Sequence, residues 1–223
     1  MNKNVIFGDK FFAEKFNNSI LISENKNLGE AVAYHPDMNL FVCDNTAFLP
    51  KNSPLENVFK TKGYEVIFVR QELKKEYPYD VLFNAKAVEN TVILNGKTIA
   101  KEILNFLKEK NKTIINVNQG YAACSVLALN ENAFITSDKG IEKALICYNK
   151  SVLKIREGYI KIKDYDYGFI GGASGFSGDT LYFFGDIAAH PDFSLIDEFL
   201  KQNNVVYKYF DTPLCDIGGC IEI

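Results

Sequence analysis

The sequence of 223 residues contains no tryptophan and only two histidines, His35 and His190. Two histidines argue against a histidine-rich metal site and against a catalytic centre that uses several histidines. The chain also lacks any run of about 18 to 20 apolar residues, the length that a membrane helix requires. Its first residues lack the apolar core of a secretion signal. These absences predict a cytoplasmic protein with no membrane contact.

Cysteine content and charge add further exclusions. The five cysteines are an odd number without a secretion signal, which predicts reduced thiols and not a disulfide framework. The cysteines and histidines do not have the spacing of metal ligands, so we expect no metal ion. The formal net charge of −3 gives no indication of a basic, nucleic-acid-binding surface. The expected partner is therefore a small-molecule ligand, and the sequence leaves homo-oligomerisation open.

A glycine-rich run at residues 171–178 has the composition of a phosphate-binding loop. It lies between two predicted strands and not ahead of a helix, so the context of a dinucleotide or phosphate loop is missing. We therefore predict a flexible hairpin loop there, whose glycines permit positive φ angles or a close approach to a ligand. No cofactor is expected.

The clearest local pattern begins at Cys124 and ends at Asp138. Two apolar runs, residues 126–129 and 133–136, flank the turn-forming residues 130–132, which predicts a hairpin. Asp138 then opens a helical pattern of apolar residues, and the apolar run 152–155 returns the chain to the sheet. The stretch therefore predicts a unit of strand, strand, helix and strand.

The same unit recurs along the chain, marked by an apolar strand that ends in Asp or Asn ahead of a helix. Such a residue can close a turn or cap the helix, which gives the marker a physical reason. The strand before each marker is predicted to begin near Ala31, Asp80, Cys124, Gly168 and Cys215, a period of roughly 45 residues. The five markers are residues 5–9, 40–44, 91–95, 133–138 and 181–186.

The repeat runs through both ends of the chain. The last predicted strand, residues 215–223, lacks a partner strand and helix, and residues 5–16 supply them at the other terminus. Pairing of these strands would close a ring and remove both sheet edges. We therefore predict the α/β class: a single domain over residues 1–223, built as a five-bladed α/β propeller closed by its terminal strands.

A ring of five such units resembles the pentein fold, the α/β propeller of the guanidino-group-modifying enzymes. That superfamily includes arginine and agmatine deiminases, dimethylarginine hydrolases and amidinotransferases. The chain is also similar, over roughly residues 60–223, to an uncharacterised bacterial domain family placed in the same superfamily. The segments that carry this second resemblance are residues 118–121, 165–172, 178–183 and 190–192.

The superfamily resemblance implies a site on the pseudo-fivefold axis, at the starts of the inner strands. A cysteine in the last unit attacks the guanidinium carbon, a histidine in the middle unit transfers protons, and acidic residues hold the cation. Cys220, directly after two glycines, matches the nucleophile. In the middle unit the family's His-x-Asp pattern falls on residues 123–125, so Ala123 stands in place of the histidine.

The remaining candidate residues follow from the same resemblance. Cys124 and His190 are the candidates for supporting catalytic roles, although core packing is the favoured explanation for the cysteine and turn chemistry for the histidine. His35 is interpreted as part of a hairpin turn in the first unit. The candidate substrate-binding residues are Glu30, Asp80, Asn84, Gln119, Asp166 and Asp216.

Two functions of different classes remain open on the sequence alone. The first is a cysteine-dependent hydrolase or transferase that acts on a guanidino or amidino small molecule. The second is a non-catalytic member of the fold that binds a small molecule or another protein. The missing middle-unit histidine favours the second function or an altered chemistry. An activated thiol at the axis, beside carboxylates in a pocket, would favour the first.

Overall fold

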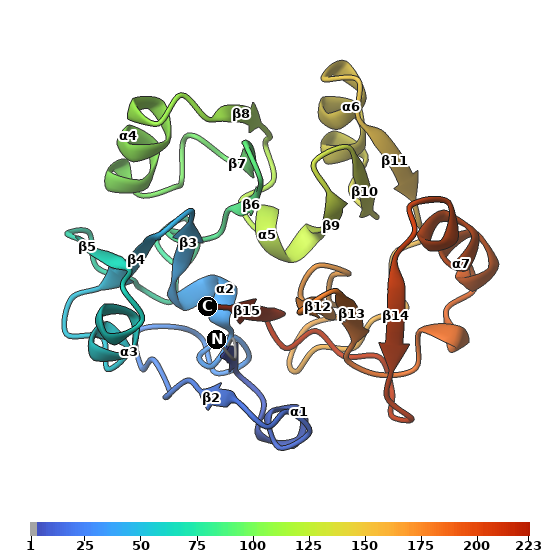
Figure 1. Cartoon of the computed structure of the whole chain (residues 1–223), viewed down its shortest axis with the longest axis horizontal. Coiled ribbons are helices and arrows are strands. Elements are labelled where there is room, and N and C mark those ends of the chain that lie inside the picture. Colours follow the sequence, from blue (N-terminus) through green and yellow to red (C-terminus); the bar gives the residue numbers. More distant parts are fainter. Residues whose placement is uncertain (1–3) are drawn as a thin grey trace.

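The computed structural model describes residues 4–223, which form five three-stranded β-sheets around a common axis (Figure 1). This arrangement confirms the predicted five-unit α/β propeller. The sheets, each in spatial order, are β15-β1-β2 (Cys220–Glu222, Val5–Phe7, Ser19–Leu21), β3-β4-β5 (Phe41–Cys43, Thr46–Pro50, Glu65–Val69), β6-β7-β8 (Lys86–Val88, Thr91–Leu94, Thr113–Asn116), β9-β10-β11 (Val126–Asn130, Ala133–Thr136, Ser151–Lys154) and β12-β13-β14 (Ser174–Ser177, Thr180–Phe183, Val206–Tyr209).

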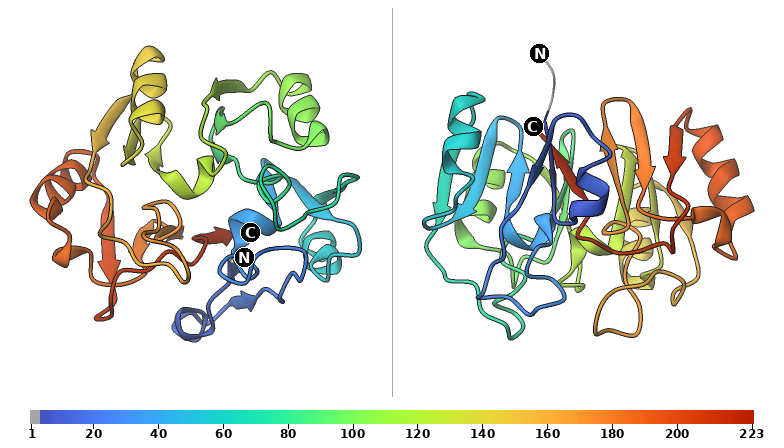
Figure 2. Two further views of the ribbon diagram at one scale, coloured as in Figure 1. Left: turned by 180° about the vertical axis from the view of Figure 1, so that it is seen from behind. Right: turned by 90° about the horizontal axis from the view of Figure 1, so that it is seen from below.

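Every sheet has the same internal connection. Its first two strands are antiparallel, and its second and third strands are parallel and joined by a helix. The helices lie at the outer edge, and the view from behind in Figure 2 shows the same layering. The connecting helices are α1 (Lys10–Ala13), α3 (Glu56–Thr61), α4 (Lys101–Glu109), α6 (Lys139–Cys147) and α7 (Phe193–Gln202), the last preceded by the short 3-10 helix η1 (Ile187–Ala189).

Four of the five Asp and Asn markers close a turn or cap a helix as the sequence predicts, whereas Asp44 lies in a hairpin turn between two strands. The Asp138 carboxylate accepts hydrogen bonds from the backbone N–H groups of Gly140 at 2.7 Å and Ile141 at 2.8 Å, and so caps α6. Asp9 caps α1 through the N–H of Phe12 at 3.1 Å. These bonds satisfy backbone donors that the first turn of a helix leaves unpaired.

The two terminal strands share one sheet. Strand β1 pairs antiparallel with β15, with Val5 opposite Glu222 and Phe7 opposite Cys220. The expected pairing of the first and last strands is therefore present. It places Cys220, at the start of β15, next to the beginning of the chain.

Two sequence predictions about the strands are wrong. Residues 40–44, predicted as the middle strand of their unit, contain the inner strand β3, because Asp44 adopts a positive φ of 52° in the hairpin turn to β4. The glycine-rich run is not wholly a hairpin loop, since β12 occupies Ser174–Ser177 and only Gly178 lies in the turn.

The inner strands also begin later than predicted. Short helical turns, α2 (Pro36–Asn39) and α5 (Ala122–Ser125), precede β3 and β9, and turns precede the other three inner strands. These segments lie near the centre of the molecule in Figure 1. These segments show neither the periodicity of a strand nor that of a long helix. The sequence pattern therefore assigns them to the strands that follow, and the predicted strands begin too early.

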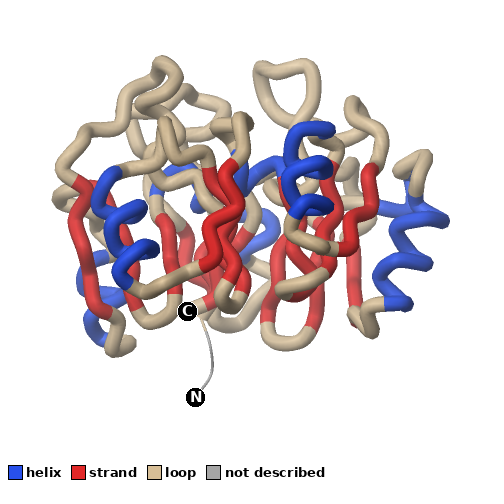
Figure 3. Tube along the Cα trace, turned by 90° about the horizontal axis from the view of Figure 1, so that it is seen from above, coloured by secondary structure: helices blue, strands red, loops and turns tan. Residues whose placement is uncertain are grey.

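Apolar side chains fill the space between neighbouring units. Phe48 of β4 is fully buried, and its ring lies 5.2 Å from that of Phe106 on α4 in the next unit. Burying a side chain of this size stabilises the fold by about 1.5–3 kcal/mol. Figure 3 shows the strands side by side, with the longer loops gathered at one end of the molecule. No helix within residues 4–223 is long and apolar enough to cross a membrane.

Close packing at the axis generates a stability prediction. A Cβ atom on Gly171 would overlap the backbone carbonyls of Ala123, Cys124 and Val126, which cannot move without shifting α5. Gly171→Ala should therefore lower the free energy of unfolding by about 1–3 kcal/mol in urea denaturation. Gly29→Ala is the matched control, because a Cβ there meets nothing within 4 Å. Equal stability of the two variants would contradict the packing argument.

Candidate active site

The residues just before the inner strands meet at the axis and form a cluster of polar groups. Helix α2 contributes Asp37, with His35 directly ahead of it, and α5 contributes Cys124. Pro36 at the first position of α2 fits this short turn, since its missing N–H would have no partner there. The second and fifth units add Asn84 and Asp216 from turns before β6 and β15.

Cys124 is the centre of this cluster. Its Sγ lies 3.0 Å from Asp37 Oδ2 and 3.1 Å from Asn84 Nδ2, and the residue is only 3% exposed. Asn84 Oδ1 accepts a hydrogen bond from the backbone N–H of Ala123 at 2.7 Å. The thiol is therefore in reach of a carboxylate and is held in place by a carboxamide.

His35 and Asp216 form a second pair in the cluster. His35 Nδ1 lies 3.7 Å from Asp216 Oδ1, and both residues are buried. Asp216 accepts hydrogen bonds from the N–H groups of Phe169 at 2.9 Å and Gly218 at 3.0 Å. A Cβ on Gly172 would overlap the Asp216 carboxylate, so this position needs glycine for the carboxylate to reach the axis.

Burial controls the protonation of these groups. Burial, and secondarily the charge of Asp216, raises the pKa of Asp37 to about 8. Burial also raises the pKa of Asp216 to about 6 and lowers the pKa of His35 to about 4. The pKa of the Cys124 thiol lies well above its ordinary value, first because of burial and then because of Asp37. At neutral pH the cluster therefore holds a protonated Asp37, a neutral imidazole and a thiol.

Two cavities meet the pair formed by Asp37 and Cys124, one lined by Cys124 and the other by Asp37. The first, of about 250 Å³, is lined by residues of the loops ahead of the inner strands, and we call it the loop-side cavity. It contains Cys124, His35 and Asp216. Its walls are largely aromatic, with Tyr121, Tyr165, Tyr167 and Phe169.

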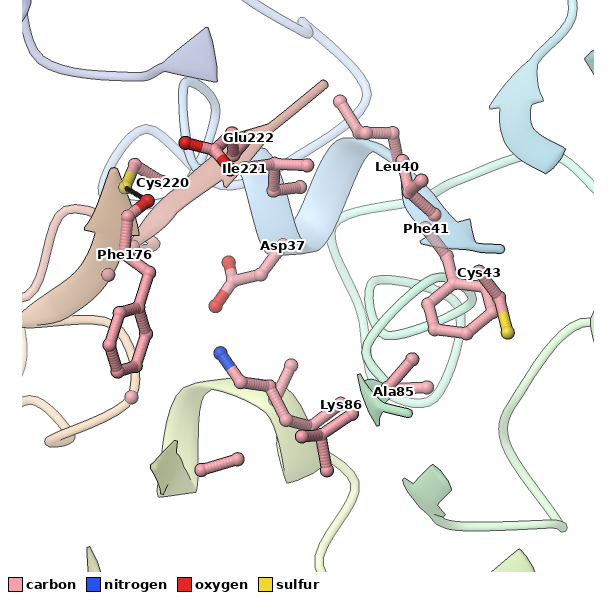
Figure 4. A pocket seen from close by; sticks show the side chains of 18 of the residues that line it. Asp37, Leu40, Phe41, Cys43, Ala85, Lys86, Phe176, Cys220, Ile221 and Glu222 are labelled. Atoms are coloured by element: carbon pink, nitrogen blue, oxygen red, sulfur yellow. Dashed lines mark hydrogen bonds between the residues drawn. The ribbon is translucent and has the colours of Figure 1, made fainter. Parts of the chain in front are cut away.

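The second cavity, of about 470 Å³, is lined by inner-strand residues of all five units, and we call it the inner-strand cavity. Figure 4 shows Asp37 and Lys86 pointing toward each other across it. Cys220 lines the same cavity, with Sγ 3.6 Å from the carbonyl oxygen of Phe176. Burial raises the pKa of Cys220 to about 12, although the charge of Lys86 acts in the opposite direction. Burial lowers the pKa of Lys86 itself.

The structure brings together several of the residues expected from the sequence. Cys124, Asn84 and Asp216 belong to the axial cluster, and Cys220 faces the inner-strand cavity. Asp80 does not line either cavity, but it accepts a hydrogen bond at 2.5 Å from the hydroxyl of Tyr121, which lines the loop-side cavity.

Other expected residues lie at the edge of the site or outside it. Gln119 accepts from the Tyr121 N–H at 3.1 Å and donates to Asp138 at 3.1 Å, so it positions Tyr121. Asp166 is exposed and borders the loop-side cavity. Glu30 is exposed and pairs with Lys163 at 3.4 Å, because the first inner strand begins well after it.

His190 does not reach the axis. Its Nδ1 accepts a hydrogen bond from the N–H of Asp192 at 3.1 Å, and its Nε2 lies 3.3 Å from the carbonyl oxygen of Arg156. It lines a separate cavity beside Tyr159. These contacts position the residues at the start of α7, which agrees with the interpretation of His190 as a turn residue.

Sequence reasoning missed His35, Asp37 and Lys86. The signal for the first two was present, since residues 35–37 have the His-x-Asp pattern in the first unit and not in the middle unit. Lys86 gives no local signal, because a single lysine in a strand is ordinary. Within residues 4–223, no group of three or more His, Cys, Asp or Glu side chains is arranged to hold a metal ion.

The raised pKa of Asp37 predicts how stability depends on pH. Asp37 binds its proton up to about pH 8 when folded and only up to about pH 4 when unfolded, so the folded state binds more protons in this window. Stability should fall as the pH rises from 4 to 8, by at most about 1.4 kcal/mol per pH unit for one group. Asp37→Asn should flatten this decline in urea denaturation, whereas Asp179→Asn, at an exposed turn, should keep it. Parallel curves for Asp37→Asn and the parent protein would refute the assignment.

Solved structures share this fold over most of their length. DDAH from Pseudomonas aeruginosa, in a mutant form complexed with citrulline, gives a TM-score of 0.61 at 9% identity over 100% of both chains. A dimethylarginine dimethylaminohydrolase adduct with S-methyl-L-thiocitrulline gives 0.60 at 9% identity over 100% of both chains. Agmatine deiminase from C. jejuni gives 0.51 at 12% identity, covering 92% of this chain and 74% of that one. All three are pentein superfamily members, so the expected pentein fold is confirmed.

Comparison at the level of sequence identifies the family. No curated protein matches the chain significantly. The model of a family of unknown function (DUF6873) matches residues 10–221, a wider span than the residues 60–223 expected from the sequence motifs. The chain therefore belongs to the DUF6873 family and has the pentein fold.

Proposed function

We propose that the chain is a cysteine-dependent hydrolase or transferase that acts on a guanidino or amidino small molecule. One observation carries this proposal: the Cys124 thiol lies 3.0 Å from the Asp37 carboxylate, at a cavity that also contains His35 and Asp216. The fold supports it, since the names of the similar solved structures refer to dimethylarginine and agmatine, which are guanidino compounds.

Unpaired acceptors in the cluster suit a cationic ligand. Asp37 Oδ1 and Asp80 Oδ1 are buried and have no hydrogen-bond partner within residues 4–223. A guanidinium or amidinium ion offers several N–H donors and a positive charge to such carboxylates. Its charge would also favour the ionised forms of Asp37 and Cys124, whose pKa values burial raises. Binding of the cation would therefore prepare the thiol for reaction.

The geometry supports a two-step reaction. Binding of the cation first releases the proton of Asp37 to solvent. In the first step the Cys124 S–H then gives its proton to the ionised Asp37 at Oδ2, the sulfur bonds to the central carbon of the cation, and a C=N electron pair moves to nitrogen. The C–N bond to the leaving amine then breaks, and Asp37 returns the proton to that amine. In the second step neutral His35 takes a proton from water, the oxygen bonds to carbon, and a C=N electron pair moves to nitrogen. That pair re-forms the C=N bond as the C–S bond breaks, and His35 gives its proton to the sulfur, which releases the thiol. An amine in place of water gives transfer.

Cys124 is a better candidate nucleophile than Cys220 on this geometry. Cys220 is the nucleophile that the family resemblance implies. Its Sγ lies 3.6 Å from the carbonyl oxygen of Phe176, and a carbonyl oxygen cannot act as the base that takes the thiol proton. Its nearest expected activator is the Lys86 charge, and burial still raises the thiol pKa to about 12. Cys124 contacts a carboxylate that can accept the proton.

A second candidate function is binding of the same cation without reaction. Two observations favour it: burial raises the pKa of both thiols, and Ala123 stands at the middle-unit histidine position. The carboxylates at the axis would then hold the ligand, and Cys124 would only line its site.

Affinity labelling distinguishes the two functions. The cationic reagent 2-chloroacetamidine should alkylate Cys124 at least about tenfold faster than neutral 2-chloroacetamide, as expected when binding of the cation contributes ~1.4 kcal/mol. The rate should rise toward pH 8 as Asp37 loses its proton, and Asp37→Asn should remove this rise. Mass spectrometry of the labelled peptides identifies the cysteine.

Three serine variants complete this test. Cys124→Ser should abolish the fast labelling, whereas Cys147→Ser, which removes an exposed thiol, should leave it unchanged. Fast labelling that survives Cys124→Ser and disappears in Cys220→Ser would reassign the nucleophile to Cys220. If Cys124 is alkylated only slowly, and guanidinium ion slows this alkylation further, the result would support binding of the cation without reaction. Equal rates for the two reagents would refute a cation site.

A further inference from the structure

The walls of the loop-side cavity are mostly aromatic and aliphatic. Four aromatic rings line it, and Val32 and Ile162 add aliphatic surface. The ring of Tyr167 meets that of Phe169 edge to face at 6.1 Å, and the ring of Tyr121 lies 6.3 Å from that of Tyr77. Such walls are suited to a planar or hydrocarbon group.

The charges around this cavity are all of one sign. Asp216 and Asp166 line it, and no lysine or arginine of residues 4–223 does. Lys163, on the same loop as Tyr165, pairs with Glu30 at 3.4 Å and does not line the cavity. The one imidazole, His35, is neutral at physiological pH because burial lowers its pKa to about 4. A carboxylate on the ligand would therefore meet two like charges and no cation.

Tyr165 lies where the outer part of a ligand would be. Its side chain lines the cavity, yet the residue is 58% exposed. An aromatic ring that is exposed in the empty site gains most from a ligand that covers it. The cavity therefore has a buried, polar end at Cys124, which is 3% exposed, and an exposed, aromatic end at Tyr165.

We propose that the ligand of this site is an amidine or guanidine whose remaining part is an uncharged aromatic or hydrocarbon group, without a carboxylate. Tyr165 is the residue that selects this group. The inference rests on the proposed function for its cationic end, and on the lining of the loop-side cavity for the rest. The proposed ligand differs from an amino-acid guanidine, because, among residues 4–223, the cavity lining has no cationic side chain to pair with an amino-acid carboxylate.

Four probes of graded structure test this specificity by isothermal titration calorimetry on the full chain. Guanidinium ion provides the cationic head alone, benzamidine adds a ring, 4-amidinobenzoate adds a carboxylate, and benzamide is the neutral counterpart. Benzamidine should bind at least about tenfold more tightly than guanidinium ion, since ring burial and stacking add to the head. The added carboxylate should weaken binding at least about tenfold.

Two tyrosine variants locate the effect. Tyr165→Ala should bring benzamidine affinity close to that of guanidinium ion and leave the guanidinium affinity unchanged. Tyr209→Ala is the matched control, because Tyr209 is also exposed, at 46%, and lies on β14 away from this cavity. Circular dichroism of both variants checks that they are folded.

The outcomes separate this inference from the proposed function. Equal or tighter binding of 4-amidinobenzoate than of benzamidine overturns the inference and leaves the cation site intact. An unchanged benzamidine affinity in Tyr165→Ala overturns the role of this residue. Benzamide that binds as tightly as benzamidine overturns the cation site and with it the proposed function. Absence of binding by all four probes overturns both.

Discussion

The hydrogen bonds of the Asn84 carboxamide hold the centre of the molecule together. Its oxygen accepts from the Ala123 N–H at 2.7 Å, and its nitrogen donates to the Asp37 carbonyl at 3.2 Å and to the Cys124 sulfur at 3.1 Å. One side chain of the second unit therefore connects the first and third units. Leaving a buried polar partner unsatisfied costs about 1–3 kcal/mol, so thiol and carboxylate cannot move apart without disturbing the fold.

The same constraint gives the site its chemistry. The axial groups come from segments far apart in sequence, yet all are buried, with Cys124 3.0 Å from Asp37 and His35 3.7 Å from Asp216. In such surroundings a carboxylate next to another carboxylate holds its proton, and a thiol holds its own. A positive charge placed beside these groups would favour the ionised forms of both.

The sequence predicts the repeated strands and helices better than the segments that meet at the axis. The hairpin and helix of residues 124–147 follow from periodicity and capping by Asp138, which are local signals. Recognition of the same signals in five copies is enough for the five-unit fold. The turns α2 and α5 give no such signal, and the first inner strand was therefore placed too early, which put Glu30 in the site and left Asp37 out.

The axial residues show why the site is harder to predict than the fold. Asp37, Lys86 and Cys124 become neighbours only because separate units converge, and no spacing along the chain encodes that convergence. A family pattern can help, but only if it is sought in every unit. The His-x-Asp pattern was expected at residues 123–125 and is present at 35–37.

Pseudo-fivefold symmetry has a consequence for how such sites can change. Each inner strand presents its first residues to one common point, so a side chain can face that point from any of the five units. The imidazole of His35, directly before α2, and the thiol of Cys124 in α5 line the same cavity, although they come from different units. The fold therefore allows different units to supply the polar groups at the axis while the centre that they surround stays in the same place.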